Sequence, residues 1–322
     1  WLLTQSQNAG TIIIGPGASP VRRLVPMPPG AGGVFCPPGG GMDKFLITGG
    51  SGSFGTAFIE RYHDQVDIAV YSRDEHKHHA MRERFPHVRY IVGDVRDAVQ
   101  VEAAMESFGG RFAVLHAAAL KHVSTGEAQP LEVVKTNVLG TSNVLHAASK
   151  HAAAFVLLST DKAVQPTNLY GATKMTAERL VLSSPRRSFC VTRYGNVIES
   201  RGSVLHKFIA QVRAGEPMTV RCPAATRFVM MMSEAVDLVY GAATGEPPER
   251  LVIPTLPAVT IATLADAVQR EVSNSSSWPW RVTGLEAGEK LHETLGDGIT
   301  SDHAPRVDPA VLTATIRRAA GL

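Results

Sequence analysis

The chain has 322 residues, 44% of them hydrophobic, and a formal net charge of only +3. This length allows a sizeable core in one large domain or two modest ones. The small charge argues against an extended nucleic-acid-binding face, which needs clustered basic residues. No apolar run approaches the roughly 20 residues of a membrane span, and Cys36, Cys190 and Cys222 lack metal-ligand spacing. We therefore expect a cytoplasmic protein with reduced thiols, no metal, and neither membrane nor nucleic-acid partners.

The first 41 residues differ in composition from the rest of the chain. Residues 16–41 are crowded with Pro and Gly, and such a stretch holds neither a helix nor a central strand. A regular pattern begins at Met42. Residues 1–41 are therefore predicted to be a disordered or non-native extension.

From Met42 onward, short apolar runs alternate with amphipathic ones. Strands and helices are expected to alternate along the chain. The predicted strands are 45–48, 67–71, 88–92, 112–116, 155–159 and 189–193. The first predicted helix ends near Tyr62, and the later ones cover 75–85, 99–108, 131–150 and 170–182. This alternation predicts an α/β fold, a Rossmann-type doubly wound parallel sheet with helices on both faces, over residues 42–197.

After Tyr194 the alternation loosens. Helices are expected at 203–214, 233–244 and 261–271, separated by short strands and Pro-containing turns. Residues 198–322 are predicted to form mainly a smaller substrate-binding lobe, with return segments to the first domain near 233–255. Such a lobe would close over the carboxyl ends of the sheet strands, where ligands of these folds bind.

A glycine-rich segment joins the first strand to the first helix. Gly49, Gly52 and Gly55 recur at three-residue intervals, with Ser53 and Phe54 between the last two. The first glycine allows a tight turn, the second a close approach of backbone to a pyrophosphate, and the third close helix–strand packing. This segment predicts a dinucleotide site, because it follows a strand and opens a helix.

The end of the second strand indicates which dinucleotide binds. An NAD enzyme usually has an acidic residue there, whereas this chain has Ser72, Arg73 and Lys77, which suit a 2′-phosphate. We therefore predict NADP. The alternative is a solvated helix start in which Asp74 is the N-cap.

Further cofactor contacts are expected where the third and fourth strands end. An acidic residue there would meet the adenine edge, and small side chains would leave room for the cofactor. These residues are Asp94, Val95, Ala117, Ala118 and Ala119.

Tyr170 and Lys174 stand at positions i and i+4 and so share one helix face. A lysine ammonium beside a phenol favours the phenolate, which would lower the tyrosine pKa and make it a general base. Both residues are also expected to contact the cofactor. The alternative is an exposed tyrosine and an unrelated surface lysine.

The most informative segment follows the fifth strand, where Thr160 precedes Asp161 and Lys162. An enzyme that only oxidises and reduces a sugar carbon has no use for this carboxyl and amine. Removal of water needs both, one group to take the proton beside a ketone and another to protonate the departing hydroxyl. The alternative is a surface ion pair at the end of the strand.

With these residues in place, the chain resembles the inverting UDP-N-acetylglucosamine 4,6-dehydratases, extended short-chain dehydrogenases/reductases of the polysaccharide-biosynthesis type. The resemblance runs from Met42 nearly to the end. It rests on ordered segments that include ITGGSGSFG at 47–55, GDVRD at 93–97, STDKAVQPTNLYGATK at 159–174, SRGSV at 200–204 and GEKLHE at 288–293.

The resemblance implies a role for each of these residues. Tyr170, helped by Lys174, would deprotonate the C4 hydroxyl held by Thr160; Lys162 would remove the C5 proton and Asp161 would protonate the C6 hydroxyl. NADP would be regenerated in each turnover, and the protein would be a homo-oligomer. The UDP-sugar substrate would be bound by Lys121, Asn196, Arg201, Arg227, Glu289 and Lys290.

Two other functions remain open from the residues. A UDP-sugar 4-epimerase or a 5,6-dehydratase would use the same scaffold. A non-catalytic NADP-binding regulator is the third hypothesis, but a regulator has no need of Asp161, Lys162, Tyr170 and Lys174 together.

Overall fold

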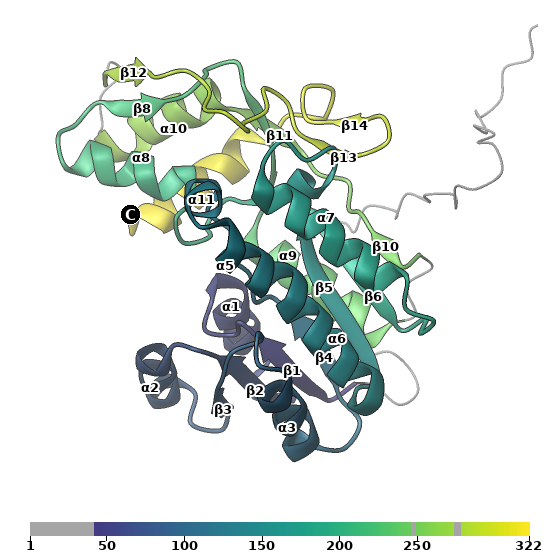
Figure 1. Ribbon diagram of the computed structural model, residues 1–322. Helices are drawn as coiled ribbons and strands as arrows, with labels where there is room; N and C mark the ends of the chain where they lie inside the picture. The colour runs from purple at the N-terminus through teal and green to yellow at the C-terminus, as the bar shows by residue number, and fades with distance from the viewer. Residues whose placement is uncertain (1–41, 246–248, 274–277) are drawn as a thin grey trace, which may run out of the picture.

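The computed structural model describes residues 42–245, 249–273 and 278–322, so Cys36 and the predicted extension at 1–41 lie outside the described residues. At its centre is a seven-stranded sheet in the order β10-β6-β5-β4-β1-β2-β3 (Figure 1). All six neighbouring pairs are parallel, which confirms the predicted Rossmann-type sheet. The strands are Lys44–Thr48 (β1), Asp67–Ser72 (β2), Arg89–Val92 (β3), Ala113–His116 (β4), Ala154–Thr160 (β5), Phe189–Tyr194 (β6) and Leu251–Val252 (β10).

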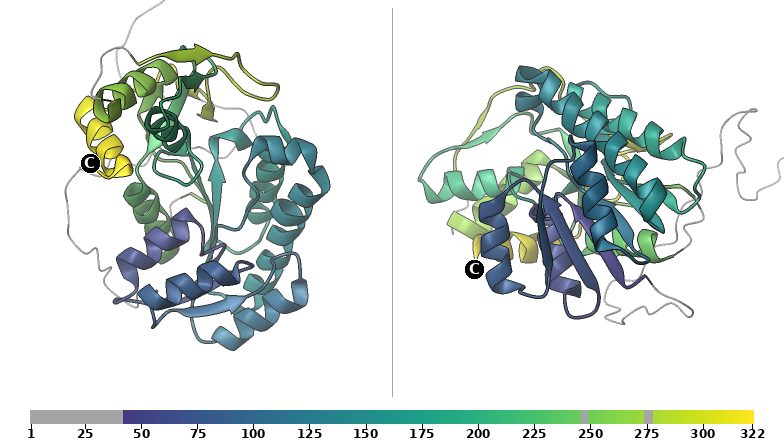
Figure 2. Two further views of the ribbon diagram at one scale, coloured as in Figure 1. Left: turned by 90° about the vertical axis from the view of Figure 1, so that its left-hand side faces the viewer. Right: turned by 60° about the horizontal axis from the view of Figure 1, so that its bottom comes forward.

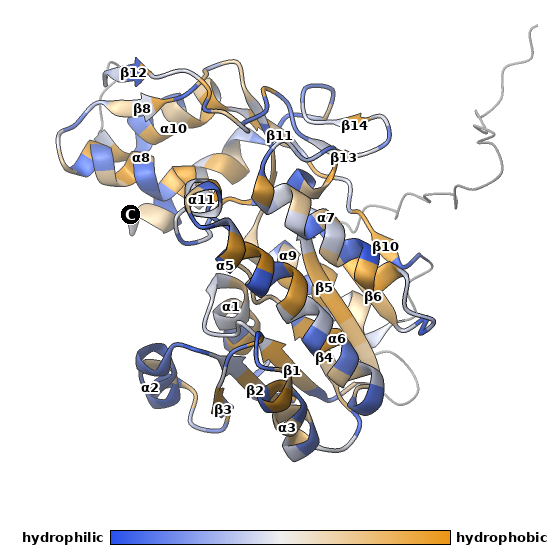
Figure 3. Cartoon of the chain, viewed as in Figure 1, coloured by the Kyte–Doolittle hydropathy of each residue, from blue (hydrophilic) through white to orange (hydrophobic). Residues whose placement is uncertain are grey.

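The sheet has this form because its central strands are apolar on both faces. All of β5 is buried, and so is all of β4, as expected for strands of a parallel sheet covered by helices. In the hydropathy view the central strands are orange, whereas blue predominates in the outlying helix α2 (Glu75–Arg84) (Figure 3).

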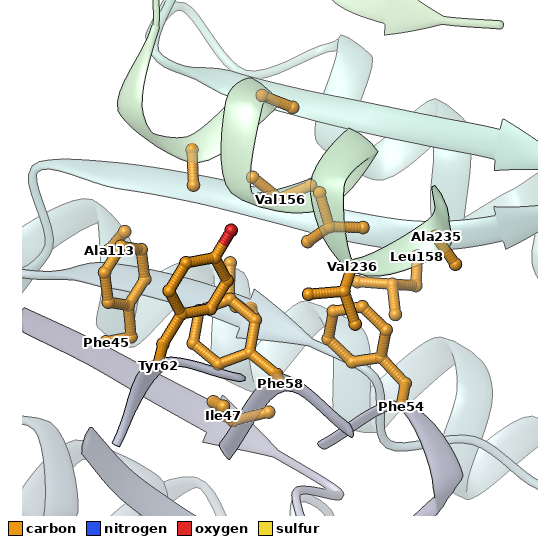
Figure 4. Close-up of a cluster of buried hydrophobic side chains, with 14 of the residues drawn as sticks. Phe45, Ile47, Phe54, Phe58, Tyr62, Ala113, Val156, Leu158, Ala235 and Val236 are labelled. Carbon is orange, nitrogen blue, oxygen red and sulfur yellow. The ribbon is translucent and has the colours of Figure 1, made fainter. Parts of the chain in front are cut away.

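Helices cover both faces of the sheet. On one face α1 (Ser53–Tyr62) and α9 (Met232–Thr244) pack together, and their side chains form a cluster with those of β1 and β5 (Figure 4). In this cluster the Phe58 ring lies 5.3 Å from that of Phe45 and 5.0 Å from that of Tyr62. The other face is covered by α3 (Ala98–Phe108), α6 (Gly140–His151) and α7 (Leu169–Leu182).

The prediction of one regular helix over 131–150 is wrong in detail. This segment consists of α5 (Pro130–Val134), a π-helical turn (Lys135–Leu139) and α6. It is preceded by a short helix, α4 (Val123–Ala128), that we did not predict. Within the π-helical turn, the buried Asn137 amide binds both backbone groups of Leu120 and the Thr173 hydroxyl. Such turns occur often at functional sites, and these bonds hold the segment after β4 against α7.

The remaining elements form a second, smaller lobe (Figure 2). Its core lies among α8 (Val204–Arg213), α10 (Ile261–Ser273) and α11 (Pro309–Ala320), the last of which we did not predict. Its strands are Asn196–Val197 (β7), Met218–Val220 (β8), Thr226–Met230 (β9), Ala258–Thr260 (β11), Trp280–Val282 (β12), Thr294–Gly296 (β13) and Ile299–Thr300 (β14). None of the helices in the described residues is long and apolar enough to cross a membrane.

The third glycine of the glycine-rich segment is required by packing. A Cβ at Gly55 would lie 2.2 Å from the Gly50 carbonyl oxygen, and backbone cannot move aside easily. Gly55→Ala is therefore expected to lower the free energy of unfolding by about 1–3 kcal/mol, measured by urea denaturation. Gly241→Ala in α9 is the control, because a Cβ there meets nothing within 4 Å. Equal stability of Gly55→Ala and wild type would contradict this packing.

Candidate active site

The candidate site lies at the carboxyl ends of the strands, around β1, β4 and β5. The order of the sheet reverses between β1 and β4, and such a switch point is where ligands bind in open parallel sheets. The glycine-rich segment follows β1, and Asp161 and Lys162 form a 3-10 turn (Asp161–Ala163) directly after β5. Parallel strands thus bring these segments to one edge.

The glycine-rich segment fits a pyrophosphate. Gly49 has a φ of +67°, and a Cβ there would lie 2.7 Å from the Ala118 Cα. A Cβ at Gly52 would meet only the Gly49 carbonyl oxygen within 4 Å, so the space beyond it is open to a ligand. The helix α1 begins at Ser53 and directs its first N–H groups at that space. The ring of Phe54 packs against Phe58 in the core, so only the backbone of Phe54 could contact a ligand.

The residues at the end of β2 that were predicted to bind a 2′-phosphate differ in their contacts and exposure. The Ser72 hydroxyl is buried, donates to the Ser51 hydroxyl (2.9 Å) and lies 2.6 Å from His78 Nε2. Asp74 caps α2, as the alternative expected, and its carboxylate pairs with Lys77. Arg73 is half-exposed at the strand end, with Nη1 3.6 Å from Asp94 Oδ2.

The residues after β3 and β4 line the same edge. Asp94 binds Arg96 with its carboxylate (2.6 Å), and its carbonyl accepts from the Tyr71 hydroxyl. The Val95 side chain is buried. The Ala117 N–H donates to the Thr48 carbonyl (3.1 Å), and Ala118 and Ala119 are partly exposed.

Tyr170 and Lys174 lie in the first turns of α7, which Asn168 caps by accepting from the Gly171 N–H. Lys174 is buried, which lowers its pKa to about 8, and its Nζ donates to the Leu158 carbonyl (2.5 Å). The prediction that Lys174 lowers the pKa of Tyr170 is wrong. Burial raises the pKa of Tyr170 to about 12, and the groups that act against burial are the Lys162 ammonium and a hydrogen bond with Thr160.

Asp161 and Lys162 form a partly buried ion pair beside Tyr170, in which the Lys162 side chain is 24% exposed. Asp161 is fully buried, and its Oδ1 accepts from Lys162 Nζ (3.0 Å) and from the Thr160 hydroxyl (2.9 Å). Lys162 Nζ also donates to Asn196 Oδ1 (3.1 Å). Asp161 Oδ2 is buried and has no hydrogen-bond partner among the described residues. This is not the surface ion pair of the alternative reading.

A family model described as polysaccharide biosynthesis protein matches residues 45–311. The chain belongs to this family.

Curated relatives and solved structures agree with that membership. The chain is 43% identical to a protein from Rickettsia canadensis named UDP-glucose 4-epimerase, over 79% of this chain and 78% of that protein. A Rickettsia rickettsii protein of the same name is 41% identical, over 83% and 81%. The structure of Pen from Bacillus thuringiensis matches with a TM-score of 0.79 and 30% identity, over 88% of this chain and 99% of that one.

More distant solved structures share the fold. A dTDP-glucose 4,6-dehydratase from Streptomyces venezuelae, solved with NAD, matches with a TM-score of 0.69 and 21% identity, over 85% of this chain and 96% of that one. The chain thus has the fold of the extended short-chain dehydrogenases/reductases, a fold that this nucleotide-sugar dehydratase shares. Its finer resemblance to UDP-N-acetylglucosamine 4,6-dehydratases stays a prediction.

This polysaccharide biosynthesis protein has a further site residue that we did not predict. The Glu293 side chain is 4% exposed, with Oε1 3.6 Å from Lys162 Nζ and 3.9 Å from Arg227 Nε. Burial acts to lower the pKa of Lys162, but Asp161 and Glu293 outweigh it and raise that pKa. Lys162 is therefore an ammonium at neutral pH. The only sequence signal for Glu293 was its place at the end of the segment 288–293.

The predicted substrate residues separate into two groups. Asn196 contacts Lys162, and Arg227 lies 3.9 Å from Glu293, so both belong to the same cluster. Glu289 pairs with Arg221 (3.3 Å), and Lys290 Nζ donates to the Val164 carbonyl (2.6 Å). These two contacts brace the segment 288–293 against its neighbours.

Lys121 and Arg201 form the second group. Lys121 Nζ donates to the Arg201 carbonyl (2.9 Å), and the Arg201 guanidinium reaches the glycine-rich segment. Both therefore lie near the glycine-rich segment and not in the cluster around Lys162.

Proposed function

We propose that this polysaccharide biosynthesis protein is an NADP-dependent UDP-N-acetylglucosamine 4,6-dehydratase that inverts C5. It would oxidise C4, eliminate water across C5 and C6, and return the hydride to C6. The observation that carries the proposal is the partly buried contact of 3.0 Å between Lys162 Nζ and Asp161 Oδ1 beside Tyr170. Elimination of water needs an acid and a base together, which simple epimerisation at C4 does not.

The dinucleotide would lie across Gly49 and Gly52 at the start of α1, with Arg73 near its 2′-phosphate and Asp94 near its adenine. When bound, it supplies a hydride acceptor that gives the hydride back within the same turnover. Tyr170 would take the proton of the C4 hydroxyl, which the Thr160 hydroxyl would hold. The positive charge of Lys162 favours the phenolate in this step.

The resting charges of the acid–base pair are opposite to those the elimination needs. At rest Lys162 Nζ forms an ion pair with Asp161 Oδ1, and the attraction of Asp161 and Glu293 raises the pKa of Lys162 and keeps it an ammonium. A proton that moves from Lys162 Nζ to Asp161 Oδ1 across their hydrogen bond turns the pair into an amine and a carboxylic acid. Exclusion of water when the sugar binds would shift the resting ion pair toward the neutral pair, since burial penalises both charges.

This single proton transfer would give both groups the protonation states that the elimination needs. The Lys162 amine then takes the C5 proton, which the C4 ketone has acidified, and Asp161 gives its proton to the C6 hydroxyl, which leaves as water. Lys162 is again an ammonium and Asp161 again a carboxylate. The hydride would then return to C6, and C5 would take a proton from solvent on the opposite face. Tyr170 would give up to solvent the proton that it took from the C4 hydroxyl, so that every group regains its starting state.

A 4-epimerase is the second candidate, and the names of the Rickettsia relatives favour it. This reaction would use Tyr170, Lys174 and the dinucleotide to oxidise C4 and to reduce it from the other face. Asp161 and Lys162 would then have no chemical role.

One assay separates the candidates. The protein is incubated with NADP and UDP-N-acetylglucosamine in deuterated water, and the product is analysed by mass spectrometry and NMR. Loss of water with deuterium at C5 is the expected result. An unchanged mass with the galacto configuration would establish the epimerase instead, and no turnover of any UDP-sugar would favour the regulator.

The choice of NADP depends on Arg73. Arg73→Ala is expected to weaken NADP binding by about 10- to 100-fold and NAD binding by less than about twofold, because an Arg–phosphate contact is charge-assisted. Calorimetric titration of both dinucleotides measures this. Lys150→Ala is the matched control, since Lys150 lies in the last turn of α6, pairs with Glu102 and is expected to change little. Equal losses of affinity for NADP and NAD in Arg73→Ala would contradict the prediction that the protein uses NADP.

A further inference from the structure

A buried ion pair lies beneath α7, the helix that carries Tyr170 and Lys174. Glu178 of this helix is 3% exposed, and the Arg193 guanidinium binds its carboxylate with two nitrogens, Nε to Oε1 (2.9 Å) and Nη2 to Oε2 (2.5 Å). Arg193 comes from β6, on which α7 packs (Figure 1). Such a two-point contact fixes the orientation of both side chains as well as their distance.

The same carboxylate also holds the end of β5. Glu178 Oε1 accepts from the Ser159 hydroxyl (2.6 Å), and Lys174, one turn earlier in α7, donates its Nζ to the Leu158 carbonyl (2.5 Å). Two residues at positions i and i+4 of α7 thus bind two successive residues of β5. Because Tyr170 lies a further turn back on the same face, these contacts set the position of its phenol along the end of the strand.

The guanidinium has a third attachment, in the smaller lobe. Arg193 Nη1 donates to the carbonyl of Leu295 (3.0 Å), a fully buried residue of β13. Leu295 follows Glu293 by two residues, and β13 also contacts the 3-10 turn that carries Lys162. Arg193 therefore joins α7 to the segment that carries Glu293.

Stability does not account for this ion pair. Burial of two charges costs free energy that their attraction only partly offsets, and an apolar pair of the same volume is often as stable or more stable. An apolar pair, however, has no hydrogen bonds to hold α7, β5, β6 and β13 at fixed distances. The pair also acts on a neighbouring charge: burial lowers the pKa of Lys174 to about 8, and the charge of Glu178 acts in the opposite direction.

We propose that Arg193 and Glu178 are positioning residues, which hold the phenol of Tyr170 at a fixed place relative to the turn after β5 and to β13. They act through α7 and not by contact with the sugar or the dinucleotide. A displacement of about 1 Å can slow a reaction about 10²-fold, so loss of the pair should slow oxidation of C4. The proposal rests on the proposed function only in taking this oxidation as the first step, which a 4-epimerase shares.

The test replaces both charges at once, because a single substitution would leave the other charge buried without a partner and destabilise the fold. The double variant Arg193→Met/Glu178→Leu removes the ion pair and keeps most of the volume, so its melting temperature is expected to match or exceed that of wild type. Stopped-flow absorbance measures the rate at which saturating UDP-N-acetylglucosamine or UDP-glucose reduces bound NADP. Calorimetric titration measures the affinities for NADP and UDP.

The expected result is a loss of rate without a loss of binding. The rate of reduction is expected to fall by about 10- to 100-fold in the double variant. Both affinities are expected to stay within about twofold of wild type, as for groups that act on the reacting geometry and not on binding.

Three further variants accompany the double variant. Arg193→Lys keeps a charge beside Glu178 but has no fork for both the carboxylate and the Leu295 carbonyl, so it is expected to lose rate by a smaller factor. Ser159→Ala removes one donor to Glu178 and is expected to act in the same direction. The matched control replaces an ion pair between α10 and α11 in the same way, Glu271→Leu/Arg317→Met, and is expected to behave as wild type.

Two results would overturn the proposal. Reduction at the wild-type rate by a double variant that melts like wild type would show that the pair has no part in the reaction. Parallel losses of rate, of both affinities and of melting temperature would show a general loss of folding instead of a displaced phenol. The product assay in deuterated water is independent of both: a galacto product without loss of water would refute the dehydratase and would not affect this proposal.

Discussion

Lys162→Ala is expected to abolish exchange of the C5 proton with solvent, by at least about 10³-fold, because the variant has no base at that carbon. Its oxidation of C4 depends on Tyr170 and is expected to continue at a lower rate, because the Lys162 charge that acts to lower the pKa of Tyr170 is lost. Substrate should therefore reduce the bound dinucleotide, and the reduced form should accumulate. NMR of the sugar in deuterated water measures the exchange, and nicotinamide absorbance measures the reduction.

Lys290→Ala is the control for Lys162→Ala. Lys290 is the neighbouring lysine of the site, but its Nζ donates to the Val164 carbonyl, so exchange at C5 is expected to remain within about threefold of wild type, the scale of one net hydrogen bond. Persistent exchange in Lys162→Ala would reassign the base, and Glu293 would be the next candidate, since its Oε1 lies 3.6 Å from Lys162 Nζ.

Tyr170→Phe is expected to lower the rate of dinucleotide reduction by about 10²- to 10⁴-fold, the usual contribution of a general base. Burial raises the pKa of Tyr170 to about 12, so the phenol is protonated at neutral pH. The phenolate fraction, and with it the reduction rate of the wild type, is expected to rise with pH until the pH approaches that pKa. The variant has no phenol to ionise and should lack this dependence. Stopped-flow absorbance at several pH values measures both.

Lys162→Ala and Tyr170→Phe are expected to block different steps of the reaction. Reduced dinucleotide should accumulate in Lys162→Ala and stay absent in Tyr170→Phe. Tyr62→Phe is a matched control, because Tyr62 stacks on Tyr240 in the core. If Tyr170→Phe reduced the dinucleotide at the wild-type rate, another group would be the base at C4.

Much of the fold could be predicted because the signals are local. An apolar run such as 155–159 makes a buried strand wherever the chain alternates strands with amphipathic helices, and β5 covers Ala154–Thr160. A parallel sheet then brings the ends of its strands to one edge, so Gly49 and Asp161 had to lie along the same edge. The π-helical turn at Lys135–Leu139 had no such signal, because its reason lies in contacts of Asn137 with Leu120 and Thr173.

The sequence by itself determined the parallel sheet, the glycine-rich segment and the order of Thr160, Asp161 and Lys162 along one strand end. Only the tertiary structure decided that Glu293 lies beside Lys162, that Arg201 reaches Ser51 and Ser53, and that burial raises the pKa of Tyr170. The physical reason is the distance along the chain over which each effect acts. Periodicity and turn chemistry act over a few residues, whereas a charge responds to every group within several ångströms, including groups more than a hundred residues away in the chain.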